Sequence, residues 1–500
     1  MPILKSVFDF IFGGEEKGPS VGGGPLGVMT PFVVLVANLK GDAEGAVGRR
    51  VVAALSGRGG LSVFAVPQNL EPDGNGAPYE QMARAAEKGR SWLEASSANL
   101  LIWGKVTEDG KAVSLRFIAC AVVGDNRAGA VGLGDRLELP VEIGNDASTL
   151  LYATVLVALS PETAAQRQTV QAFLPTLTPV LERYQTATIP GLSPRQWART
   201  QLCIGHATAS LGSLLNNAEW LTKSIALYRR ALQGIDRAHG PEDWGIAQIH
   251  LANALTAMAS GSTEMEMLNE AVQCCRFALE AFPRDQYALD WAGTQNRLGL
   301  LHHRRGVVSG ETGPLSEAIV AFQAALQEFT KTKWPTRWAE VLNNMARSMQ
   351  VQGEFTRSKQ LLDQAVAICG VVMKVLSRDK QKILWAATQI NLGTTLFALG
   401  KVTFDNSHLA AAETAFRDAI EIYKAGGDTR MVQGLEMHLF RLQRFADSRS
   451  KSGDAKGGES KSADGGKGAS DGKGGDAKGA TGGKAGEEKA ADAAARAAKA

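Results

Sequence analysis

Residues 291–299 read WAGTQNRLG, and residues 385–393 read WAATQINLG. The tryptophan that opens both stretches also stands at positions 197, 244 and 338, so five tryptophans follow one another at intervals of 47 residues. A fixed period of this length is typical of a structural unit that stacks on copies of itself. Residues 190–428 are therefore predicted to hold five such units.

Other positions keep the same frame. Seven residues after each tryptophan stands a large apolar residue, and the next residue is always small: Gly205, Ala252, Gly299, Ala346 and Gly393. Leucine stands 24 residues after each tryptophan, and apolar residues continue from it at helical spacing. Each unit is thus predicted to be two antiparallel helices. Helix A begins near the tryptophan and helix B near the leucine, and the small residue lets the two helices approach closely.

Residues 28–146 have a different period. Apolar runs at 32–39, 61–66, 100–106, 112–120 and 136–143 predict strands. Stretches at 43–56 and 79–97 predict helices between the strands, so the order indicates a small α/β domain with a mixed sheet. The glycine-rich stretch 129–134 has the wrong spacing for a nucleotide-binding loop.

The remaining segments frame these two regions. Residues 1–12 are predicted to form a short apolar helix, and residues 13–27 a glycine-rich linker. Residues 147–189 are interpreted as a degenerate first repeat or cap, residues 429–445 as a capping helix, and residues 446–500 as a disordered tail of Lys, Gly, Ala and Asp. The fold class predicted is α+β multidomain: a small N-terminal α/β domain, an all-α solenoid and a disordered tail.

The opening Trp-Ala-x-Thr-Gln and the Leu-Gly that follows resemble the tetratricopeptide repeat family. A standard unit of that family has about 34 residues, so units of 47 residues look like an extended, bacterial variety. Residues 33–120 resemble the TolB amino-terminal-like α/β domain, through VVLVANLKGD at 33–42 and ANLLIWGKV at 98–106.

The first resemblance implies that the protein binds other proteins. Tetratricopeptide repeats present their A helices along a concave groove that takes a peptide or a partner helix. The helix A positions left over by the predicted core are rich in side chains that hydrogen-bond peptides or carboxylates. They are Arg199, His206, Asn253, Asn296, His303, Arg304, Asn343, Arg347, Gln350 and Thr394. The alternative for each of them is a solvated helix face.

Composition and motifs exclude several other classes. Fifty-four basic against 51 acidic side chains leave a net charge of +3, without the basic concentration that nucleic-acid binding needs. No catalytic, phosphate-binding or metal motif is present, so no catalytic residue, cofactor or metal is predicted. The five cysteines lack zinc-ligand spacing and are expected to be free thiols. With no recognisable signal peptide or membrane span, we expect a cytoplasmic protein.

Three functions remain after these exclusions. The favoured one is a non-catalytic scaffold or adaptor that holds a protein or peptide partner in the groove. The alternative is a membrane-proximal assembly or sensing factor tethered through residues 1–12, although docking of that segment on protein is favoured because it carries only Lys5, balanced by Asp9. The third is an enzyme with its site in the α/β domain. The identity of the partner and the oligomeric state are left open.

Overall fold

The computed structural model describes residues 32–76, 78–120, 127–159, 164–215 and 217–458. The helix predicted at 1–12 and the linker predicted at 13–27 lie outside the described residues, as does the tail beyond residue 458. The chain divides into two compact units, one ending at Leu301 and the other beginning at His302. Each unit is considered by itself.

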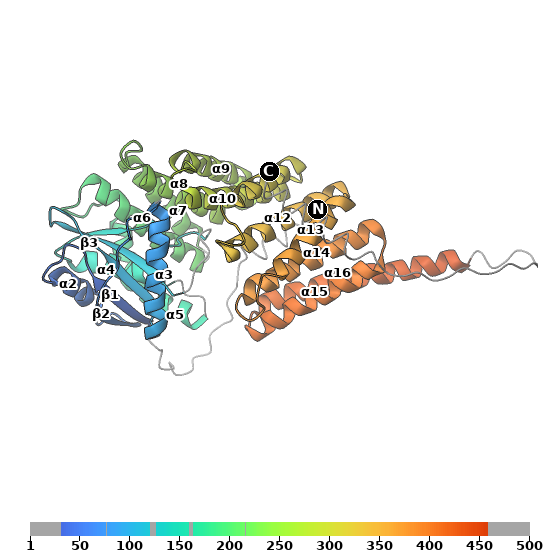
Figure 1. Cartoon of the computed structure of the whole chain (residues 1–500), viewed down its shortest axis with the longest axis horizontal. Coiled ribbons are helices and arrows are strands. Elements are labelled where there is room, and N and C mark those ends of the chain that lie inside the picture. The colour runs from blue at the N-terminus through green and yellow to red at the C-terminus, as the bar shows by residue number, and fades with distance from the viewer. Residues whose placement is uncertain (1–31, 77, 121–126, 160–163, 216, 459–500) are drawn as a thin grey trace, which may run out of the picture. The chain divides into compact units, whose positions relative to one another are not determined.

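A five-stranded mixed sheet opens the first unit (Figure 1). Its strands are β1 (Phe32–Asn38), β2 (Leu61–Asn69), β3 (Leu100–Val106), β4 (Ala112–Ala119) and β5 (Leu137–Pro140). The spatial order is β2-β1-β3-β4-β5, with β1 parallel to β2 and β3, and with β3–β4 and β4–β5 antiparallel. The mixed sheet predicted from the apolar runs is present, and together with the helices that follow it confirms an α+β layout.

Helices cover both faces of this sheet. Helix α3 (Pro78–Ser96) packs Ala86 and Leu93 on the face that carries Leu35, Leu101 and Trp103. Helices α2 (Ala46–Leu55) and α4 (Asn145–Ala158) cover the opposite face. Because successive strand residues point to opposite faces, a central strand with both faces covered needs an unbroken apolar run, which β1 supplies.

The core of the sheet continues into the first helices. One cluster of buried apolar side chains runs from β1 and β3 through α4 and α5 (Ala164–Arg183) to Ile204 and Leu227 in the first helix pair. The stretch interpreted as a degenerate repeat therefore holds most of α4 together with α5, whose Pro175 and Pro179 lie inside the helix. The sheet and the first helices of this unit fold around a common core.

Helix pairs make up the rest of the described chain. They are α6 (Pro194–Leu214) with α7 (Ala218–Gly234), α8 (Pro241–Met258) with α9 (Glu264–Ala281), α10 (Ala288–Ser309) with α11 (Thr312–Ala325), α12 (Pro335–Thr356) with α13 (Lys359–Met373), α14 (Lys382–Thr403) with α15 (Asn406–Ala425), and a final α16 (Thr429–Gly458). The first helix of each pair begins at 194, 241, 288, 335 or 382. Proline stands in the first turn of α6, α8 and α12, where its missing N–H has no helical acceptor to lose.

A close contact between glycine and an aromatic ring joins the two helices of a pair. A Cβ atom at Gly205 would lie 2.5 Å from Cε1 of Tyr228, and one at Gly393 would lie 2.7 Å from Cε1 of Phe416. Both rings are fully buried. The positions equivalent in sequence hold Ala252 with Cys275 and Ala346 with Cys369, all fully buried. A large ring is thus combined with glycine, and a small thiol with alanine.

A basic side chain accompanies four of the five repeat tryptophans. Arg237, Arg284, Lys331 and Arg378 each stand seven residues before a tryptophan and lie over its ring, at 4.7, 5.1, 6.0 and 5.0 Å from the ring centroid. Trp197 has Pro190 at that position. These four tryptophans, each near the start of a helix A, therefore hold a cation over the ring. In the sequence, this cation contact is indicated by a basic residue seven positions before the tryptophan.

Helix α14 lies in the core of the second unit. Among the described residues it is the one helix long and apolar enough to cross a membrane, but 67% of that apolar stretch is buried. It packs against α12, α13 and α15. The apolar composition of α14 is accounted for by these neighbours.

The final helix, α16, continues past residue 445, where the sequence predicts the start of the tail. It runs to Gly458. Arg449 donates hydrogen bonds to Oδ1 of Asn406 (2.9 Å) and to the carbonyl of Phe404 (2.6 Å), so the added turns are held against the α14–α15 connection. Leu435 and Leu442 are buried, whereas Met437 and Phe440 are 50% and 55% exposed.

Protonation of His438 is expected to destabilise the packing of α16. Its ring stacks on Phe416 with centroids 5.2 Å apart. Burial, assisted by the charge of Arg441, lowers the pKa of His438 to about 4. An unfolded histidine takes up its proton near pH 6.5. The neutral form therefore stabilises the fold above pH 6.5, and this contribution is lost as the pH falls towards 4.

We expect this loss to be about 1–2 kcal/mol, less than the full pKa difference would give because the ring is only half-buried. The measurement is urea unfolding of the wild type and of His438→Gln at pH 7 and at pH 4.5. The stability advantage of the wild type should shrink at the lower pH. An advantage of equal size at both pH values would contradict the prediction.

Candidate functional site

The ten side chains predicted to line a binding groove are mostly buried within the chain. His206 is fully buried, and Asn253, Asn296, His303, Arg304, Asn343 and Gln350 are less than one tenth exposed. Arg199, Arg347 and Thr394 are half-buried. Burial lowers the pKa of Arg347 to about 10. The structure does not bring the ten residues together on one open surface, and their role in binding a partner stays a prediction.

Two of these side chains, Asn253 and Asn343, take part in hydrogen bonds between A helices instead. Arg297 on α10 donates to Oδ1 of Asn253 on α8 at 2.9 Å. Asn391 on α14 donates to Oδ1 of Asn343 on α12 at 2.8 Å. In these two places, polar side chains of one helix A therefore satisfy those of another, which accounts for the burial of Asn253 and Asn343.

Three others also have hydrogen-bond partners, one on the next helix A and two within the same helix. His303 Nδ1 lies 2.9 Å from the hydroxyl of Ser348 on the next helix A. Gln350 donates to Glu354 within α12 at 3.0 Å, and the hydroxyl of Thr394 donates to the carbonyl of Ile390 one turn earlier at 3.0 Å.

In the first unit, Arg199 belongs to a buried ion cluster between the sheet and the helix pairs. Its centre is Asp243 on α8, which is 3% exposed and accepts from Arg136 (2.6 Å), Arg195 (3.0 Å) and Arg199 (2.7 Å). We call these four residues together with Glu138, which pairs with Arg199 at 3.1 Å, the Asp243 cluster. Burial opposes ionisation of Asp243, but Arg136 and Arg199 outweigh it and hold the pKa of that carboxyl well below its usual value.

The glycine-rich stretch 129–134 forms the loop before β5 and packs this end of the sheet against α6 and α8. Gly129 has a φ of +77°, and a Cβ there would lie 2.5 Å from the carbonyl of His206 and 2.6 Å from the amide nitrogen of Ser210. A Cβ at Gly134 would lie 2.5 Å from Ile246 on α8. The glycines thus let the loop before β5 lie directly against the backbone of α6 and against α8.

Next to the Asp243 cluster lies a second polar group, the His–Asp cluster of Asp135, His206 and His250. Asp135 ends the glycine-rich loop, His206 lies on α6 and His250 on α8. Nε2 of His206 is 3.2 Å from Asp135 Oδ1, and Nε2 of His250 is 3.0 Å from the same oxygen. Their ligand-bearing atoms all lie within 4.8 Å of one another, so these three residues could hold a metal ion.

The electrostatics of this cluster follow from its burial. Burial opposes the charge of Asp135, but His250 and His206 outweigh it, so the pKa of Asp135 lies well below its usual value. Burial and the charge of His250 lower the pKa of His206, which favours its neutral form. Sequence spacing predicts no metal site because the three residues lie far apart along the chain and form no local motif.

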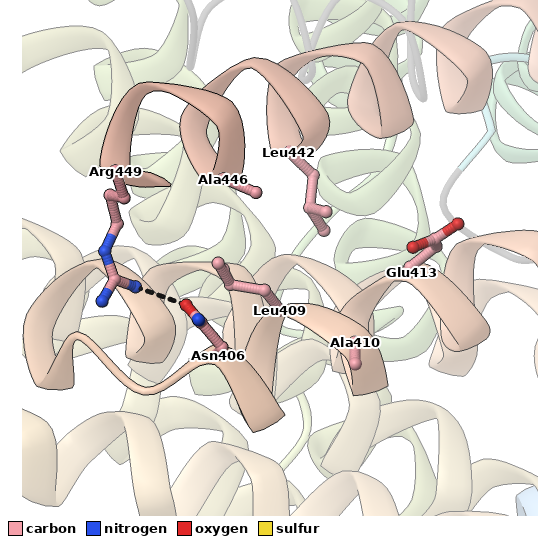
Figure 2. A pocket seen from close by; sticks show the side chains of 7 residues that line it. All are labelled: Asn406, Leu409, Ala410, Glu413, Leu442, Ala446 and Arg449. Carbon is pink, nitrogen blue, oxygen red and sulfur yellow. Dashed lines mark hydrogen bonds between the residues drawn. The ribbon is translucent and has the colours of Figure 1, made fainter. Parts of the chain in front are cut away.

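A small cleft opens between α15 and α16 in the second unit (Figure 2). Its volume is about 380 Å³, and it is lined by Asn406, Leu409, Ala410, Glu413, Leu442, Ala446 and Arg449. Leucine and alanine form its apolar part, and Glu413 and Arg449 are its charged side chains. The Arg449–Asn406 hydrogen bond crosses one end of the cleft (Figure 2).

Comparison with known families agrees with this architecture. Residues 338–373 match the tetratricopeptide repeat family. The match covers most of α12 and all of α13, which form one helix pair. The chain therefore contains tetratricopeptide-like repeats, a class of helix pair associated with protein–protein interaction. No curated protein matches the chain.

Proposed function

We propose that the chain is a non-catalytic scaffold whose helix pairs bind a protein or peptide partner. The observation that carries this proposal is the tetratricopeptide match at residues 338–373, on a helix pair whose neighbours repeat its packing. In the finer form of the proposal, the pairs over residues 190–428 stack as a solenoid with extended repeats, and the partner lies along the A helices.

Burial limits where the partner can make contact. Of the ten predicted residues, Arg347 and Thr394 keep partial exposure in the second unit, on α12 and α14. Their side chains differ in charge and size, but both belong to helix A. We therefore place the partner on the A helices of these two pairs, of which α12 lies mostly within the segment that matches the family and α14 follows it.

Site-directed cross-linking tests this placement. Four of the five cysteines are buried, and Cys120 is exposed. A Cys120→Ser chain thus offers a background in which a new surface cysteine is the accessible thiol. A benzophenone maleimide attached to Thr394→Cys in this background should cross-link the partner when the full-length chain is incubated with extract of its host and irradiated.

Val320→Cys is the matched control, because Val320 is 64% exposed on α11, which is a B helix. Cross-linking at Thr394→Cys that is several-fold stronger than at Val320→Cys supports the proposal. Equal cross-linking at both positions, or none at either, would contradict it.

A further inference from the structure

The His–Asp cluster has the composition of a metal site and lies at the junction of three separate segments. Asp135 is 4% exposed, His206 is fully buried and His250 is 6% exposed. Asp135 comes from the loop before β5, and the two histidines come from the A helices of successive pairs. A ligand held by all three would tie the sheet to both helix pairs.

Two of the three separations between the ligand atoms are those of a coordination shell, and all three atoms lie within 4.8 Å of one another. Tetrahedral zinc with bonds of about 2.0–2.1 Å keeps its ligand atoms about 3.3 Å apart. The two Nε2 atoms lie 3.2 and 3.0 Å from Oδ1 of Asp135. An ion bound to Oδ1 of Asp135 and to both Nε2 atoms therefore requires the two imidazoles to adjust around a carboxylate that already lies at ligand spacing from each.

Hydrogen bonding alone leaves this cluster incomplete. Nε2 of His206 lies 3.2 Å from Oδ1 of Asp135 but outside hydrogen-bond geometry, and Nδ1 of His250 has no hydrogen-bond partner among the described residues. A metal ion would give the first of these nitrogens a partner. A buried polar atom without one is costly, so this is a specific reason for a ligand at this point.

The surrounding residues orient the cluster as supporting residues do in metal sites. The other nitrogen of His206, Nδ1, lies 2.9 Å from the hydroxyl of Tyr228, and the amide of Gly132 donates to Oδ2 of Asp135 at 2.7 Å. With Nδ1 protonated towards Tyr228, Nε2 of His206 carries a lone pair directed at the cluster. The nearby acids Glu138 and Asp243 are held by Arg199 and are not competing ligands.

We propose that Asp135, His206 and His250 bind one divalent transition-metal ion of the zinc class, which fastens the α/β sheet to the first two helix pairs. Two imidazoles and one carboxylate suit Zn²⁺ and Co²⁺, whereas Mg²⁺ and Ca²⁺ prefer oxygen-only sites. Because all three ligands are buried, we assign the ion a structural role, with the fourth tetrahedral position left open to a further ligand.

The test is metal binding by the full-length protein after treatment with a chelator. We expect one equivalent of Zn²⁺ or Co²⁺ per chain, a higher midpoint of thermal unfolding with either ion, and no effect of Mg²⁺. Bound Co²⁺ should give a tetrahedral visible spectrum without a thiolate charge-transfer band. Failure of the wild type to bind Zn²⁺ at micromolar concentration, or a thiolate band, would overturn the assignment.

Substitutions distinguish a metal site from a polar contact. His250→Gln keeps a hydrogen-bond donor for Asp135 but should weaken metal binding more than about 100-fold, and Tyr228→Phe should weaken it about 10–100-fold. His438→Gln, which removes a histidine far along the chain, should bind as the wild type does. If His250→Gln does not fold, metal binding by His206→Gln and the Co²⁺ spectrum of the wild type test the proposal in its place. Undiminished metal binding by the folded His250→Gln or His206→Gln variant would refute the proposal.

Discussion

Replacing Asp243 with alanine is expected to lower the free energy of unfolding by about 3–5 kcal/mol. Asp243 is 3% exposed and is the shared partner of Arg136, Arg195 and Arg199. Without the carboxylate, Arg136, whose side chain is 19% exposed, keeps its charge at a desolvated site without its partner, and Arg199, which is 14% exposed, keeps only Glu138. Breaking a buried pair costs far more than the pair contributes, because the remaining charge has lost both its partner and its water.

Urea unfolding of the full-length protein measures this loss. The matched control is Glu270→Ala, which removes the exposed ion pair with Arg229 (2.6 Å) and should cost less than about 1 kcal/mol. If Asp243→Ala costs no more than this control, the Asp243 cluster does not hold the sheet to the helix pairs. The unfolding of the first unit should show the loss, because every member of the cluster lies in that unit.

Replacing Gly393 with valine is expected to cost about 3 kcal/mol, at the upper end of overpacking effects. A Cβ at this position would lie 2.7, 2.9 and 3.0 Å from three atoms of the Phe416 ring. That ring is fully buried and stacks on His438, so it has little freedom to move away. The measured quantity is the free energy of unfolding, with thermal melting as a second readout.

Gly370→Val is the matched control for this prediction. Gly370 lies on α13, and a Cβ there would meet no neighbouring atom within 4 Å, so valine should be nearly neutral. A double variant adds a sharper test. Gly393→Ala combined with Phe416→Cys reproduces the combination found in the second and fourth pairs, and should cost at least about 1 kcal/mol less than the sum of the two single changes. Simple additivity would show that the two positions are not coupled.

Much of the fold could be predicted because its signals are local and periodic. The apolar runs place β1, β3 and β4 to within a residue or two, and the repeat frame places the starts of α6, α8, α12 and α14 close to their tryptophans. A buried strand needs an unbroken apolar run, and a helix with one buried face needs apolar residues at fixed spacing. Both patterns can be recognised in a single sequence. The glycine at the helix crossing was also predictable, because a small residue recurs next to a large one.

The candidate site was less predictable, for a physical reason. Asn343 and Asn253 look like surface residues by type, but they are buried because residues 44 to 48 positions away supply their hydrogen bonds. Asp135 meets His206 and His250 only after the glycine-rich loop has packed on α6 and α8. The last turns of α16 are held by hydrogen bonds from Arg449 to Asn406 and Phe404. Helix propensity depends on local sequence and therefore does not predict such a tertiary contact.

Within a helix pair, an aromatic ring packs on glycine and a cysteine thiol stands with alanine, and this combination limits how the repeat sequence can evolve. Both partners of each pair belong to the same stretch of 47 residues, because the ring follows its glycine within one helix hairpin. Duplicating or losing a whole hairpin therefore keeps every ring with its glycine. Recombination inside a hairpin, by contrast, would set Phe416 against an alanine or Cys369 against a glycine, leaving a clash or a void. Exchange of a whole hairpin thus leaves the contact between its own ring and glycine, or thiol and alanine, intact.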